Sequence, residues 1–365
     1  MQGKDNQLPT FYDDWLNMWD KSREEFSNAR KWIHEEEVEY VETQQDAKVG
    51  LLVTPETGFR TWGSTSMISE IPVGAHTGTH KHGEEAIHII AGSGFSIVNG
   101  VRYNWEQFST LIIPFGAVHQ HFNTGDVPAR YFSVMSPHLE FWCGMARFTQ
   151  YDNWGRTTAL PTVPVSENGF DDRGRRIVLK IEEAPTTMGA EGGPGLAPEE
   201  ILEIDPDKPI VLGTIEGYAA AGIRPGLHNA GGVNFMRVGK DTNGWHPYEQ
   251  EISSYLINQP HDEGGTHAHM EAHLYIIQGS GYSIVDEEKI PWKEGTCFHV
   301  QGPQTKHQHI NTSDVQSKQI RVAPGIRYFF EAMAKEEFPY LYYKVRPRLL
   351  REKATAERER ERERS

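Results

Sequence analysis

Cysteine and long apolar runs are both scarce in this chain, and their scarcity excludes several classes of protein. The 365 residues include only Cys143 and Cys297, too few for a disulfide framework or a cysteine zinc site. We expect both to be small buried residues. No apolar run approaches the roughly 20 residues that cross a bilayer, and the N-terminus lacks the apolar stretch of a signal peptide. We therefore expect a cytoplasmic protein.

Basic residues are also in deficit. The chain has 36 Lys and Arg against 51 Asp and Glu, which gives a net charge of −15. Nucleic acids and anionic membranes are bound by basic surfaces, so we expect neither as a partner. A small-molecule substrate remains open, because it responds to local charge only. The 35 Gly and 21 Pro favour many turns, and therefore short strands over long helices.

The same unit occurs twice in the sequence. GTHKH begins at Gly78 and GTHAH begins at Gly265, a spacing of 187 residues. HQHFNTGD begins at His119 and HQHINTSD begins at His307, a spacing of 188 residues. The segments GSGFSIV and GSGYSIV repeat in the same register. Several matching blocks in one order indicate duplication of a whole domain.

Each unit is predicted to consist of short strands. Alternating apolar and polar residues bounded by turn residues occur at 86–90, 95–98, 111–113 and 274–277, which is typical of a sandwich or barrel. We predict a mainly β protein with two tandem barrels. The expected boundaries are a helical N-terminal extension at 1–45, a first barrel at 46–143, a linker at 144–208, a second barrel at 209–326, and a C-terminal helix with a charged tail at 327–365.

The N-terminal extension has a helical pattern over residues 10–33. Thr10 and Asp13 have the spacing of a capping box at its start. Apolar residues then recur at helical spacing: Trp15, Trp19, Phe26, Ala29 and Ile33. We expect this stripe to pack on a barrel or on a neighbouring subunit.

Three histidines recur in each unit and are candidate metal ligands. In the first unit they are His80, His82 and His119; in the second they are His267, His269 and His307. An H-x-H pair on a strand places both imidazoles on one face, because side chains alternate along a strand. A third histidine from another strand can complete a set inside a barrel. Neutral imidazole is the commonest metal ligand that proteins supply.

These residues resemble the two motifs of the cupin superfamily. His80, His82, Glu85 and Gly92 resemble the first motif, and the second motif is matched by Pro114, Gly116, His119 and Asn123. In the second unit the matching residues are His267, His269, Gly279, His307 and Asn311. The resemblance implies two double-stranded β-helix (jelly-roll) barrels, hence a bicupin. It also implies a divalent metal in at least the first barrel.

The first motif departs from the family pattern at its carboxylate. The gap before Glu85 is one residue shorter than usual, so either Glu84 or Glu85 could face the metal. In the second unit Ala272 occupies the equivalent position, flanked by Glu271 and His273. A fourth ligand in that barrel is therefore an open question.

The resemblance extends to bicupins of the gentisate-dioxygenase type. This resemblance implies an Fe(II)-dependent dioxygenase that cleaves a hydroxylated aromatic acid with O2. A first alternative is a manganese bicupin of the oxalate-decarboxylase type. Its site uses three histidines and one glutamate, which could be supplied here by His80, His82, His119 and Glu85. A second alternative is a bicupin that binds a small molecule without catalysis.

Further residues are candidates for roles around the metal. His121 and His309 lie two residues beyond the motif histidines and could act as acid/base groups. Arg130 and Arg321 follow the second motif and could bind a substrate carboxylate, since a guanidinium does so with two hydrogen bonds. Trp105 could contact an aromatic substrate. A homo-oligomer is expected, because barrels of this kind associate through sheet edges and added helices.

Overall fold

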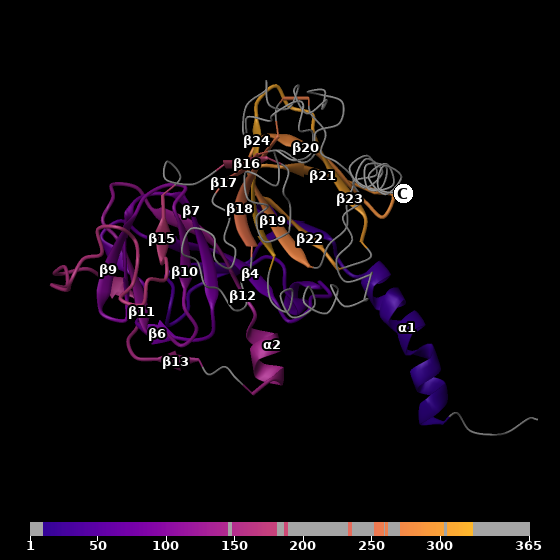
Figure 1. The fold of residues 1–365 in the computed structure, drawn as a ribbon, viewed down its shortest axis with the longest axis horizontal. Coiled ribbons are helices and arrows are strands. Elements are labelled where there is room, and N and C mark those ends of the chain that lie inside the picture. Colours follow the sequence, from indigo (N-terminus) through magenta and orange to yellow (C-terminus); the bar gives the residue numbers. More distant parts are fainter. Residues whose placement is uncertain are drawn as a thin grey trace, which may run out of the picture.

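The computed structural model describes residues 10–144, 148–180, 186–188, 233–235, 252–258, 260–261, 271–302 and 305–323. In these ranges the chain is mainly β, with two barrels lying side by side (Figure 1). The predicted fold class is confirmed. The expected C-terminal helix lies outside the described residues. Neither of the two described α-helices has the length and apolar content needed to cross a bilayer.

The N-terminal helix α1 (Phe11–Asn28) begins where the sequence predicts. Thr10 and Asp13 form the expected capping box. The helix ends five residues before Ile33, because the backbone of Ala29 is extended and the chain continues into strand β1 (Trp32–His34). Helix α1 projects away from both barrels (Figure 1), and Trp15 and Trp19 of its aromatic stripe are exposed. Phe26 near its C-terminal end packs against Trp62, with ring centroids 6.0 Å apart, so the expected packing is found at that end of the helix.

Barrel 1 consists of two opposed sheets. The first has the order β15-β10-β7-β12-β4-β3-β2. The second has the order β13-β6-β11-β5-β14, with β8 and β9 attached through β11. The strands of the first sheet are β2 (Tyr40–Val41), β3 (Lys48–Leu51), β4 (Thr65–Ile71), β7 (Glu85–Ala91), β10 (Thr110–Ile113), β12 (Ala129–Met135) and β15 (Val178–Leu179). Those of the second are β5 (Ala75–His76), β6 (His80–Lys81), β8 (Gly94–Val98), β9 (Val101–Trp105), β11 (His119–Asn123), β13 (Thr149–Gln150) and β14 (Gly155–Arg156). A short helix α2 (Pro137–Trp142) follows β12.

Barrel 2 repeats this arrangement. One sheet has the order β1-β22-β19-β24-β18-β17-β16, and the other has the order β21-β20-β23. Their strands are β16 (Thr186–Met188), β17 (Val233–Phe235), β18 (Ile252–Asn258), β19 (Ala272–Gln278), β20 (Ser280–Val285), β21 (Glu288–Lys293), β22 (Thr296–Val300), β23 (His307–Asn311) and β24 (Ser317–Ala323). Pairing of β7 with β12 and of β19 with β24 has equivalent register, including a bulge in each pair.

Barrel 2 takes an edge strand from the N-terminal segment of the chain. Strand β1 precedes barrel 1 in the sequence but pairs with β22 of barrel 2. Strand β15 follows barrel 1 along the chain and pairs with its β10. Between the barrels lies a shared apolar core that contains Ile68 and Phe132 from barrel 1 and Tyr275 and Cys297 from barrel 2. The expectation that both cysteines are buried is wrong for Cys143, which is exposed just after α2.

Alternation along the strands then decides which side chains enter a barrel. On β7, Ile87 and Ile89 belong to the core cluster inside barrel 1, and Ala86 belongs to the core between the barrels. Glu85 shares the inward face with Ile87, because side chains two residues apart lie on the same side of a strand. The fold therefore delivers a carboxylate to the interior of barrel 1.

Candidate metal centre

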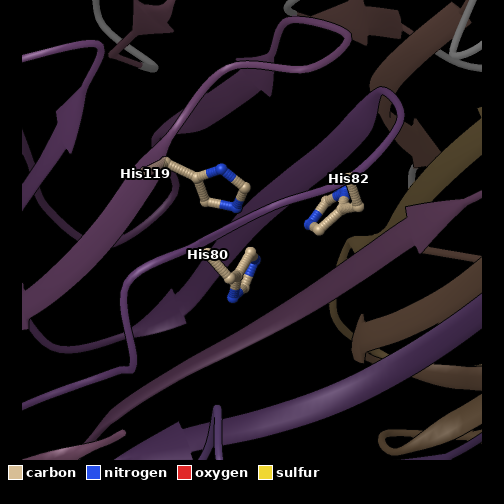
Figure 2. A group of neighbouring side chains, drawn as sticks. All are labelled: His80, His82 and His119. Atoms are coloured by element: carbon tan, nitrogen blue, oxygen red, sulfur yellow. The ribbon is translucent and has the colours of Figure 1, made fainter. Parts of the chain in front are cut away.

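Three histidines of barrel 1 converge in its interior. His80 lies on β6, His82 follows that strand directly, and His119 begins β11, which pairs with β6 at His119 and His80. All three are buried. Their ring centroids are 4.7, 4.2 and 4.8 Å apart, and their ligand atoms all lie within 4.8 Å of one another. Figure 2 shows the rings directed toward a common space.

Backbone hydrogen bonds select the tautomer that can bind a metal. Nδ1 of His119 lies 2.9 Å from the carbonyl oxygen of Ala117, and Nδ1 of His82 lies 3.0 Å from that of Gly83. Because a carbonyl oxygen only accepts, each Nδ1 carries the hydrogen and donates it. The lone pair of each ring is therefore on Nε2, and the buried Nε2 atoms of His80, His82 and His119 make no hydrogen bond. Three orphaned nitrogens facing one another fit a divalent cation.

The histidines are also neutral, as a metal ligand must be. Burial lowers the pKa of His82 to about 3, with a further contribution from the neighbouring His119. Burial lowers the pKa of His119 to about 4, against the hydrogen bond to Ala117. The pKa of His80 is also lowered, first by burial and then by the surrounding imidazoles. No proton therefore has to leave these rings at neutral pH.

Glu85 adds a carboxyl group to the histidine set. Its Oε2 lies 3.5 Å from Nε2 of His82 and 3.8 Å from Nε2 of His119. Burial raises the pKa of Glu85 to about 8, the nearby hydroxyl of Ser133 opposes the rise, and the nearby Asp46 adds to it. Glu84 is buried as well. Without a cation, Glu85 is therefore mostly a neutral acid at pH 7.

His121 lies beside the metal centre, and its ligand atom is within 4.8 Å of those of Glu85 and His119. Its Nδ1 is 2.6 Å from Oγ of Ser96, and the indole N–H of Trp105 donates to the same oxygen over 2.9 Å. The hydroxyl hydrogen of Ser96 can then be donated to Nδ1, which leaves the ring hydrogen of His121 on Nε2. Trp105 is a core residue of the barrel, so it positions Ser96 and, through it, His121.

Arg130 is not brought to the histidines. It lies on the outer face of β12 and forms an ion pair with Glu35 at a surface cleft of about 530 Å3. The carboxylate of Glu35 also accepts hydrogen bonds from Tyr40 and Tyr275, each 2.5 Å long. Arg130 therefore lines a cleft beside the seam between the barrels.

Barrel 2 retains part of the same arrangement. Nδ1 of His307 lies 3.1 Å from the carbonyl oxygen of Thr305. His309 contacts Ser283, which also accepts from the indole of Trp292, as His121, Ser96 and Trp105 do in barrel 1. His267 and His269 lie outside the described residues. Arg321 is buried on β24 of barrel 2, so it is not part of the metal centre of barrel 1.

A second buried cluster, missed from the sequence, joins the barrels. Glu271, His273 and His299 have ligand atoms within 4.8 Å of one another. Glu271 accepts from Nε2 of His299 over 2.7 Å and from the backbone N–H of Trp62 over 3.2 Å. Nε2 of His273 contacts Oγ of Ser64 at 2.8 Å.

The hydrogen bonding of this cluster is opposite to that of the metal centre. Nε2 of His299 is turned toward the carboxylate, and the Nδ1 atoms of His273 and His299 make no hydrogen bond. Burial raises the pKa of Glu271, but hydrogen bonds from His273 and His299 outweigh it and lower that pKa to about 2. The cluster therefore holds a charged carboxylate at the joint between the barrels. His273 and His299 are direct partners on the neighbouring strands β19 and β22. No sequence motif predicts this pairing, because it depends on the strand register.

Comparison with known proteins agrees with this geometry. Residues 67–135 match the family described as Cupin domain. These residues include every barrel 1 ligand candidate, and the chain has the fold of a two-barrel cupin. No relative was found among curated protein sequences.

Solved structures share the fold at low sequence identity. A variant of salicylate 1,2-dioxygenase from Pseudoaminobacter salicylatoxidans in complex with gentisate aligns with a TM-score of 0.59 and 15% identity, covering 92% of this chain and 95% of that chain. An oxalate decarboxylase variant from Bacillus subtilis aligns with a TM-score of 0.55 and 11% identity, covering 85% of this chain and 84% of that chain. Both are bicupin enzymes, and the likeness is one of fold.

Proposed function

We propose that the protein is a metal-dependent bicupin enzyme with its reaction centre in barrel 1, and that it is an Fe(II)-dependent dioxygenase of a hydroxylated aromatic acid. The observation that carries the proposal is the convergence of three buried Nε2 atoms that make no hydrogen bond, those of His80, His82 and His119. Imidazole ligands suit Fe(II) among other ions. When bound, ferrous iron supplies the electron transfer between substrate and dioxygen.

The protein residues have separate tasks in this proposal. His80, His82 and His119 would hold the ion through neutral nitrogens, so these three ligands add no negative charge of their own. His121 holds a hydrogen on Nε2 and can donate it to a substrate oxygen. The apolar core of barrel 1, which includes Ile87, Leu111 and Ile113, keeps bulk water from the site.

Oxygen uptake tests the proposal. Iron-loaded protein is mixed with a panel of hydroxylated benzoic acids, and dioxygen consumption is followed with an electrode. We expect uptake with at least one ortho-hydroxylated acid, and a loss of more than 100-fold, on the order expected for removing a ligand, in His119→Ala. His138→Ala removes a histidine that is only half-buried on the surface and serves as the matched control. No uptake with any acid would contradict a ring-cleaving dioxygenase.

A manganese-dependent decarboxylase is a second candidate, and the position of Glu85 favours it. A carboxyl group at 3.5 and 3.8 Å from two ligand nitrogens could complete a four-residue ligand set. Carboxylate oxygen also suits Mn(II) better than an all-imidazole set does. Manganese-loaded protein incubated with oxalate should then release CO2 and formate, and Glu85→Gln should abolish the release. Oxygen uptake without CO2 release from oxalate would eliminate this candidate.

A further inference from the structure

The inner wall of barrel 2 carries a polar stripe on strand β24. Ile320 and Val322 belong to the core between the barrels. Side chains alternate along a strand, so Gln319 and Arg321 lie on the other face, toward the interior of barrel 2. Both are buried, with 0% and 2% of their surface exposed. Their partners across β19 include Leu274, which belongs to the apolar cluster inside barrel 2.

The side chains of this wall differ in kind from those at the same positions in barrel 1. Pairing of Ile87 with Ser133 in barrel 1 corresponds to pairing of Leu274 with Arg321 in barrel 2. Ala272 occupies the position of Glu85. A carboxyl group and a hydroxyl group in one barrel are thus replaced by a methyl group and a guanidinium in the other. A guanidinium stays protonated even when it is buried, so Arg321 brings a positive charge to the inner wall of barrel 2.

Gln319 gives a second, independent indication of a ligand. Neither Nε2 nor Oε1 of its amide makes a hydrogen bond. A buried amide left without partners costs about 1–3 kcal/mol, so such groups are rare unless something else satisfies them. Apolar side chains form the neighbouring wall: Leu274, Ile276 and Phe298. Pockets with an apolar wall and a few converging polar groups are typical of small-molecule sites.

We propose that barrel 2 is a binding site for a small organic monocarboxylate and not a second metal centre. Arg321 binds the carboxylate, since its planar fork matches two carboxylate oxygens. Gln319 hydrogen-bonds a polar atom of the same ligand, and the apolar body of the ligand lies against Leu274 and Phe298. This site is separate from barrel 1, so the proposal does not depend on the reaction proposed for that barrel.

Calorimetric titration of benzoate into the full-length, metal-loaded chain tests the proposal, with benzamide as its uncharged counterpart. We expect benzoate to bind and benzamide to bind at least about tenfold more weakly, because the amide lacks the charge. Arg321→Gln should weaken benzoate binding at least about tenfold while metal content stays at one ion per chain, and Arg321→Lys should weaken it less. Lys318→Gln removes a positive charge from the outer face of the same strand and should change affinity less than twofold.

Three results would overturn the proposal: equal affinity for benzoate and benzamide, unchanged benzoate affinity in Arg321→Gln, or a second metal ion per chain that is retained with Arg321 in place. If Arg321→Gln does not fold, a crystal of the wild-type protein with 4-bromobenzoate decides the matter. An anomalous bromine peak inside barrel 2, with the carboxylate at Arg321, supports the proposal. A peak in barrel 1 alone, or no peak, contradicts it.

Discussion

Hydrogen bonds to single carbonyl oxygens determine what the histidines of barrel 1 can do. The carbonyls of Ala117 and Gly83 hold the ring hydrogens of His119 and His82 on Nδ1. Without those two acceptors, each ring could turn its N–H inward and lose its ability to bind a cation. In barrel 2, by contrast, Nε2 of His299 lies 2.7 Å from Oε1 of Glu271, and Nε2 of His273 lies 3.5 Å from the same oxygen. The hydrogen-bond partners of the imidazoles therefore distinguish the metal centre of barrel 1 from the Glu271 cluster.

Proton release on metal binding tests the state of Glu85. Its pKa of about 8 in the metal-free protein means that the carboxyl group is mostly protonated at pH 7. A bound cation favours the carboxylate, and the histidines are already neutral. We expect about 0.9 proton released per ion at pH 7 and about 0.1 at pH 9, measured with a pH indicator in weakly buffered solution.

Glu85→Gln is the control for that experiment, because it keeps the shape of the side chain and removes the ionisable group. The variant should release almost no proton at either pH. Release that is the same in the wild type and in Glu85→Gln would show that the proton comes from another group.

Strand register determines which side chains of a strand face the barrel interior and which face outward. The sequence did not predict this register. The duplication, the barrels and the three-histidine set could be predicted, because motif spacing and alternation are local signals. Arg130 and Arg321 both follow the second motif, so they looked equivalent. Pairing shows that Arg130 corresponds to Lys318 on the outer face and that Arg321 corresponds to Ser133 on the inner face.

Gly92 lies in the turn between β7 and β8. Gly92 has φ of +86°, and a Cβ there would lie 2.7 Å from Cα of Ala129. Gly92→Ala therefore adds a steric clash to the strain of a left-handed backbone. We expect the free energy of unfolding to fall by about 2–4 kcal/mol, measured by urea denaturation of the metal-free protein.

Gly100→Ala separates the two contributions. Gly100 has a similar φ of +80°, and a Cβ there would meet no atom within 4 Å. This variant should lose only about 1 kcal/mol, which is the cost of the backbone strain. Equal losses in Gly92→Ala and Gly100→Ala would show that the close approach of Ala129 is unimportant.

At the scale of the whole molecule, the barrels are joined by an apolar core and by one buried carboxylate. Glu271 of barrel 2 accepts from the backbone of Trp62 in barrel 1, and the indole N–H of Trp62 donates to the carbonyl of Gln301 over 2.7 Å. Strand β1 adds a further link, since it pairs with β22. The sequence could not predict this joint, because its members are about 200 residues apart.

Removal of the joint carboxylate should destabilise the whole chain. Glu271→Ala leaves the N–H groups of Trp62 and His299 buried without an acceptor, and we expect a loss of about 3 kcal/mol in the free energy of unfolding. Glu167→Ala, at an exposed glutamate, should lose less than about 0.5 kcal/mol. Thermal denaturation of both variants measures the difference, and an unchanged midpoint in Glu271→Ala would contradict a role in joining the barrels.

The central claim is that His80, His82 and His119 bind one divalent metal ion. Elemental analysis of the protein, purified without chelators and then saturated with Fe(II) or Mn(II) and desalted, tests it most directly. We expect one ion per chain in the wild type and in His138→Ala, and less than about a tenth of an ion in His119→Ala, because one of three ligands is lost. A wild-type chain that retains no ion, or a His119→Ala chain that retains as much as the wild type, would contradict it.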